Sequence, residues 1–100
     1  MEKVLEMSIE DWRIEIDEID EQIIRLLNMR AKLAIKVGDL KMTKGLRIWD
    51  SEREQNVINQ VLQANRGPLD EQAVTKIFKR IIMESRRIET QALNTNSPAI

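Results

Sequence analysis

Apolar residues recur every three or four positions in three segments of the chain, which is the spacing of helices that bury one face. The first segment runs from about Ile9 to Thr43 without a proline, and Ser8 stands where a helix N-cap belongs. The second covers about residues 51–64 and the third about 70–93. The pattern predicts an all-α fold of three helices within one domain over residues 1–100, with a frayed polar tail at 94–100.

The length of the first helix carries a prediction about assembly. At about 1.5 Å per residue, this helix would be roughly 50 Å long, whereas a compact domain of 100 residues has a radius of gyration of about 13 Å. In a monomer its apolar stripe would be left in water, so a second chain is needed to cover it. We expect an intertwined homodimer, and a long two-helix coiled coil is the competing arrangement.

Composition and charge narrow the possible chemistry. Sixteen Lys and Arg residues against seventeen Asp and Glu give a net charge of −1, which argues against a nucleic-acid binder. No apolar run is long enough to span a membrane, and the charged first residues do not resemble a signal peptide, so we expect a cytoplasmic protein. Because the chain has no His, Cys or Tyr, His/Cys zinc sites and Ser–His or Cys–His nucleophile pairs are excluded.

Several charged or hydroxyl side chains lie within or beside the apolar stripes. They are Arg13, Arg30 and Lys41 on the first helix, Asp50, Glu52, Arg53 and Glu54 at the start of the second, and Ser85 and Glu89 on the third. Each group has an ordinary structural interpretation. The basic residues can be solvated helix side chains, and the SERE segment at 51–54 fits a capping box. The pair on the third helix can lie on a solvent-exposed edge of that helix.

Helix geometry indicates how the basic residues would share a ligand. Arg30 and Lys41 are eleven residues apart, which is three turns, so they point in nearly the same direction about 16 Å apart along the axis. Arg13 lies seventeen residues before Arg30, about 25 Å away, and cannot easily reach the same small ligand. In an antiparallel dimer, however, the partner's Arg13 can approach Arg30. This geometry favours one site per chain, completed by the other chain.

The order and spacing of these residues resemble the all-helical, type II chorismate mutases over about Ile9 to Gln91. The segments that carry the resemblance are WRIEIDEID (12–20), LLNMR (26–30), VGDLK (37–41), DSERE (50–54) and IIMES (81–85), the last followed by Glu89. None is specific alone, but their order and gaps together match the family's pattern. The NRGP turn at 65–68 is similar to the subgroup associated with or fused to DAHP synthase, which makes that enzyme an expected partner.

The resemblance implies a chorismate mutase, an isomerase that converts chorismate to prephenate in phenylalanine and tyrosine biosynthesis. The reaction is a unimolecular pericyclic rearrangement, so no cofactor, metal or nucleophile is required. By the same resemblance, Arg13 of the partner chain, with Arg30 and Lys41, would bind the two substrate carboxylates. Lys41 and Glu89 would both contact the ether oxygen of the breaking bond.

The resemblance also assigns the remaining site residues. Glu54, with the backbone near Asp50, would hold the ring hydroxyl, Arg53 would add positive charge, and Ser85 would support the ring carboxylate. Many family members have Gln where this chain has Glu89. Because an ionised carboxylate cannot donate a hydrogen bond, Glu89 would have to be protonated to serve the ether oxygen.

Three other functions fit parts of the pattern. An isochorismate pyruvate-lyase would use the same basic groups, but the acid Glu54 favours the mutase, because the lyase has an apolar residue at this position. A regulatory module that binds chorismate or prephenate and controls DAHP synthase belongs to a different class. A helical dimerisation module without a ligand is the plainest alternative, and stabilisation by a chorismate analogue would separate it from the others.

Overall fold

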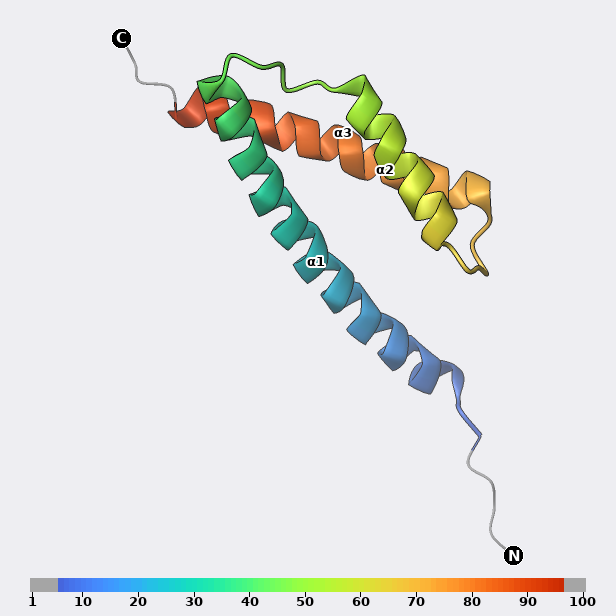
Figure 1. Cartoon of the computed structure of the whole chain (residues 1–100). Helices are drawn as coiled ribbons and strands as arrows, with labels where there is room; N and C mark the ends of the chain where they lie inside the picture. The colour runs from blue at the N-terminus through green and yellow to red at the C-terminus, as the bar shows by residue number, and fades with distance from the viewer. Residues whose placement is uncertain (1–5, 97–100) are drawn as a thin grey trace, which may run out of the picture. The chain divides into compact units, whose positions relative to one another are not determined.

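The computed structural model describes residues 6–96, which form three helices and no strand (Figure 1). The helices are α1 (Ile9–Thr43), α2 (Ser51–Ala64) and α3 (Glu71–Asn96), so the predicted all-α class is confirmed. The third helix ends three residues later than the predicted Leu93, and the expected tail therefore cannot begin at Asn94. Asn94 to Asn96 contain neither Gly nor Pro, which would favour a helix end, and the rest of the predicted tail, residues 97–100, lies outside the described residues.

A reciprocal cap begins α1 at the predicted N-cap, Ser8. The Ser8 hydroxyl oxygen accepts from the Asp11 backbone N–H at 3.1 Å, and the Ser8 backbone N–H and hydroxyl each donate to Asp11 Oδ2 at 2.9 Å. The backbone and then the side-chain hydrogen bond from Ser8 lower the pKa of Asp11. This stabilisation is present at neutral pH and is lost as the pH falls through the lowered pKa.

The end of α1 is set by Gly45, whose φ of 69° is in the left-handed region. The Leu46 N–H donates to the Lys41 carbonyl at 2.7 Å, and the Gly45 N–H donates to the Met42 carbonyl at 3.1 Å. These two bonds form a Schellman motif, which satisfies carbonyl groups at a helix end and turns the chain out of the helix. The loop 44–50 therefore leaves the end of α1 in a defined direction, within one helical turn of Lys41.

Contacts divide the chain into two units, Met1–Arg30 and Ala31–Ile100, and the single domain over residues 1–100 stays a prediction. In the second unit α2 packs against α3 around buried Val57, Ile58 and Ile82, with Leu62 and Phe78 against them (Figure 1). In the first unit most large apolar side chains of α1 are exposed, and Leu27 is half-buried. None of the described helices is both long enough and apolar enough to cross a membrane.

The Schellman motif predicts a stability cost for any residue with a Cβ at Gly45. An added Cβ meets no atom within 4 Å, so Gly45→Ala should destabilise only through its left-handed backbone, by about 1–2 kcal/mol. Gly45→Asn should lose less, because Asn tolerates this conformation better than Ala. Urea unfolding at matched protein concentration measures both changes. Equal midpoints for the wild type and Gly45→Ala would contradict the assignment.

Candidate active site

The first turn of α2 shows which of two acidic groups caps the helix. Asp50 is the N-cap, with extended backbone (φ −128°, ψ 93°), and its Oδ1 accepts from the Arg53 backbone N–H at 3.0 Å. The capping box between Ser51 and Glu54 is therefore not formed, because the helix already begins at Ser51 and the Asp50 side chain takes the first-turn donor. Glu54 has no capping task, and its carboxylate is available for other contacts.

Glu54 faces Arg86 across the α2–α3 interface. Glu54 Oε2 lies 3.6 Å from Arg86 Nε, and the two side chains are only 27% and 34% exposed. The Arg86 guanidinium carbon also lies 5.1 Å from the centre of the Trp49 ring, within the range of a cation–π contact. Glu54, Arg86 and Trp49 therefore form one cluster that joins α2, α3 and the loop 44–50.

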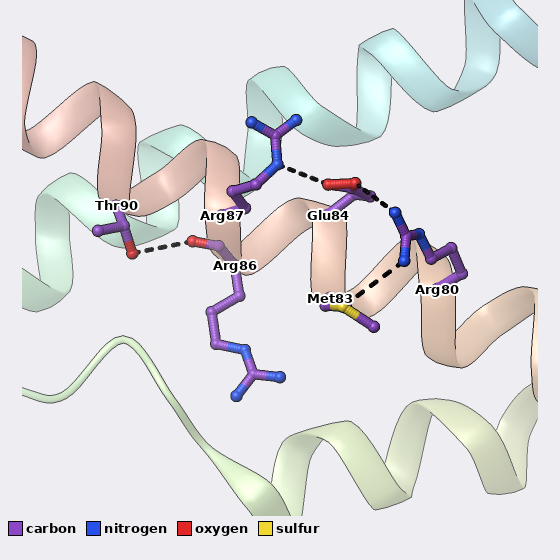
Figure 2. A network of polar contacts seen from close by, with 6 residues as sticks. All are labelled: Arg80, Met83, Glu84, Arg86, Arg87 and Thr90. Atoms are coloured by element: carbon purple, nitrogen blue, oxygen red, sulfur yellow. Dashed lines mark hydrogen bonds and ion pairs between the residues drawn. The ribbon is translucent and has the colours of Figure 1, made fainter.

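The sequence analysis did not single out Arg86. A signal was available, because Arg86 follows Ile82 by one helical turn, and Ile82 belongs to the buried face of α3. Figure 2 shows Arg86 pointing away from Glu84 and Arg87, which lie on another side of the same helix. A charged residue at a position predicted to face the core is itself an indication of a partner.

Lys41 joins the end of α1 to the loop that follows. Its half-buried side chain donates from Nζ to the Ile48 carbonyl at 3.1 Å. Ile48 directly precedes Trp49, the residue that stacks on Arg86. The Lys41 ammonium is therefore linked through two adjacent loop residues to the cluster that contains Glu54.

Glu89 packs against the only buried residue of α1, Gly38. A Cβ built at Gly38 would lie 3.3 Å from Glu89 Cβ, Cγ and Oε2, which is tighter than nine in ten real Cβ contacts, so the Glu89 side chain would have to shift by a few tenths of an ångström. Glycine thus leaves room for the present approach of α1 to α3, and Glu89 Oε2 is buried in it. Since Lys41 follows Gly38 by three residues, Glu89 lies against the helical turn that leads to Lys41.

These contacts close a ring within the second unit. It runs from Lys41 through the loop to Trp49 and Arg86, along α3 to Glu89, and across Gly38 to the turn before Lys41. The ring contains two of the predicted site residues, Lys41 and Glu89, and Arg86 connects a third, Glu54, to it. Ser85, half-buried, lies one turn before Glu89 on α3.

Other predicted site residues lie outside this ring. Asp50 and Arg53 are exposed, and Asp50 uses its side chain for the cap. Arg13 and Arg30 belong to the first unit. Arg13 is 65% exposed and pairs with Glu10 at 3.0 Å, whereas Arg30 is half-buried.

A separate polar network covers another side of α3 (Figure 2). Glu84 accepts from Arg87 at 2.6 Å and from Arg80 at 3.4 Å. The hydrogen bond from Arg87 is the main reason why the pKa of Glu84 is lowered. Such pairs between residues three or four apart are ordinary features of solvated helix faces, and they add little to stability.

Comparison with known proteins covers nearly all of the described helices. The family described as chorismate mutase type II matches residues 12–90. A bifunctional chorismate mutase/prephenate dehydratase from Aquifex aeolicus is 38% identical over 86 residues, which are 82% of this chain and 24% of that protein. The chain thus spans about a quarter of the length of this relative.

Two further relatives are close to this chain in length. A chorismate mutase from Methanocaldococcus jannaschii is 32% identical over 87 residues, 86% of this chain and 88% of that protein. A solved structure of chorismate mutase (Form II) from Thermus thermophilus superposes with a TM-score of 0.81 at 31% identity, over 83% of this chain and 94% of that one. On the family match, these relatives and the helical fold, this chain belongs to the type II chorismate mutase family.

Proposed function

We propose that this chain catalyses the rearrangement of chorismate to prephenate, a step towards phenylalanine and tyrosine. The observation that carries the proposal is the ring of contacts in the second unit, which links Lys41, Glu54 and Glu89. These residues stand at the positions where the family resemblance assigns substrate contacts. An ammonium group suits a carboxylate or ether oxygen of the chorismate dianion, an ionised acid can accept from its hydroxyl, and a protonated carboxyl can donate to its ether oxygen.

The reaction needs positioning and charge stabilisation. The site must hold the enolpyruvyl arm folded over the ring, so that the bond-forming carbon atoms are already close. Negative charge builds on the ether oxygen as its bond to the ring breaks, and a fixed donor there is worth about 3–4 kcal/mol by analogy with oxyanion holes. An ammonium has three donors, so Lys41 can keep its bond to the Ile48 carbonyl while it donates to substrate.

The proposed roles of Arg13 and Arg30 depend on a homodimer. Large apolar side chains of the first unit, Trp12, Ile16, Ile19 and Ile23, are all about half exposed in the single chain. Their spacing places them on one stripe of α1, and a contiguous exposed apolar surface of this kind marks an interface. We propose that two α1 helices cover each other there, and that each chain's Arg13 reaches the site of its partner.

Two wider expectations also remain proposals. We propose a cytoplasmic location, which is consistent with helices that cannot span a membrane within residues 6–96. Association with DAHP synthase stays a prediction. The Aquifex aeolicus relative instead combines its chorismate mutase with a prephenate dehydratase.

The proposed activity can be tested directly with the purified chain. Loss of chorismate absorbance, with the product identified by mass and by its acid conversion to phenylpyruvate, should show prephenate. The rate of pyruvate release from isochorismate should be much lower than the rate of chorismate consumption, because the acid Glu54 suits the mutase. Faster pyruvate release would reassign the chain to the lyase. Binding of a chorismate analogue without any turnover would indicate a regulatory module.

The shared site predicts complementation between two inactive variants. Arg13→Ala and Arg30→Ala should each lower activity by about 100-fold or more, because each removes a fixed cation from a bound carboxylate. After subunit exchange, half of the dimers are mixed, and one site in each mixed dimer has both arginines. About a quarter of the wild-type activity should therefore return.

The control for this experiment is exchange of each variant with itself, which should restore nothing. Sedimentation at micromolar concentration should give twice the chain mass for all samples. Proven exchange without recovery of activity would show that Arg13 serves the site of its own chain. An active, folded monomer would remove the dimer from the proposal.

Glu89 predicts a pH dependence with a defined sign. The donor role needs the protonated carboxyl, so activity should fall as the pH rises and the acid ionises. Glu89→Gln supplies a donor that does not titrate, and it should stay active and flatten the profile. Glu89→Ala should be poor at every pH. A wild-type profile that Glu89→Gln leaves unchanged would show that Glu89 is not the titrating donor.

A further inference from the structure

Arg86 differs from the other paired arginines of α3 in what it contacts. Arg80 and Arg87 pair with Glu84, a residue three or four positions away on the same helix, and all three lie on a solvated face (Figure 2). Arg86 instead reaches an acid on another helix, at 3.6 Å, and stacks on a ring in the loop before that helix, at 5.1 Å. An arginine that joins three segments around one carboxylate constrains that carboxylate.

We propose that Arg86 is a positioning residue, which uses Trp49 and its own charge to aim the Glu54 carboxylate at the ring hydroxyl of the substrate. The inference rests on the proposed function, because it concerns how Glu54 meets chorismate. It adds Arg86 and Trp49 to the residues on which substrate binding depends. Neither of them was assigned a role by the family resemblance.

The geometry of the guanidinium supports an indirect role. A guanidinium is planar and carries its N–H donors in the plane, so an aromatic ring over one face fixes that plane without using the donors. The Arg86 guanidinium carbon lies over the Trp49 ring while its Nε faces Glu54 Oε2, so the ring can restrict the guanidinium without taking the donor that meets Glu54. The contact falls on Oε2 of Glu54, and Oε1 remains available for a hydroxyl donor.

The distance and burial of the pair also matter. At 3.6 Å the contact is an ion pair and is too long for a strong hydrogen bond. Arg86 can thus attract the Glu54 carboxylate into one orientation, and the lone pairs of Glu54 remain able to accept a hydrogen bond from substrate. Because both side chains are about two-thirds shielded from water, the attraction is screened less than on an open surface.

The inference predicts a particular kinetic signature. A hydrogen bond from the ring hydroxyl to Glu54 is made in the bound substrate as well as in the transition state. Loss of such uniform binding raises KM and leaves kcat nearly unchanged. Arg86→Met, which keeps much of the length of the side chain but removes the charge, should therefore raise KM by about fivefold. Arg86→Lys, which keeps the charge, should recover part of this loss.

The deciding experiment is a double-mutant cycle with Glu54→Gln, read as KM and kcat for chorismate. If Arg86 acts through Glu54, Arg86→Met should have no further effect once Glu54 is Gln. The matched control is Arg87→Met, the next residue on α3, whose partner Glu84 is outside the ring. This control should leave both constants unchanged, and circular dichroism should confirm equal folding of all variants.

Trp49→Leu provides a second test if Arg86→Met does not fold. Trp49 is 62% exposed, so its replacement should not disturb the core, and it should raise KM in a way that again disappears with Glu54→Gln. Additive effects of Arg86→Met and Glu54→Gln would overturn the inference and indicate direct contact of Arg86 with substrate. Unchanged KM in Arg86→Met would overturn it as well. A wild-type chain without chorismate turnover would instead overturn the proposed function, and the inference with it.

Discussion

The approach of α1 to α3 at Gly38 places Glu89 beside the helical turn that leads to Lys41, and the arrangement of the predicted site residues depends on it. A Cβ at this position would lie 3.3 Å from Glu89, so a larger residue would need the Glu89 side chain to shift, whereas glycine lets the two helices approach without that shift. A mid-helix glycine costs about 1 kcal/mol of helix stability relative to alanine. This glycine stands one turn before Lys41, a predicted site residue. The packing brings the acid of one helix and the turn before the lysine of another together, and the loop 44–50 closes the arrangement.

Charge in this small protein is organised at two levels. Pairs such as Arg13 with Glu10 join neighbouring turns of one helix and remain in water, where screening makes them weak. The pair of Glu54 with Arg86 joins two helices and is largely shielded. The net charge near zero therefore includes two kinds of ion pair, which differ in how strongly water screens them.

Much of the fold follows from periodicity, because each helix buries one face and its apolar residues must recur at helical spacing. The N-cap of the first helix was predictable because Ser8 was the evident capping residue. The N-cap of the second helix was ambiguous because Asp50 and Ser51 are adjacent and either side chain can cap a helix. The end of α3 was misplaced because polar residues such as Asn94 signal a surface, not the end of a helix. Lys41, Glu54 and Glu89 were predicted as site residues from the family resemblance, and their roles stay predictions. Arg86 was missed because its partners, Glu54 and Trp49, are distant in sequence and only tertiary packing brings them together.

The two bonds that hold Lys41 have a consequence for the entropy of binding. Its carbonyl accepts from Leu46 at 2.7 Å, and its ammonium donates to Ile48 at 3.1 Å, so main chain and side chain are both tied to the same loop. A free lysine side chain carries about 2 kcal/mol of rotamer entropy. Here much of that freedom is already lost when the chain folds. An anion that arrives therefore meets an ammonium that is already ordered, and more of its attraction to that charge remains as affinity.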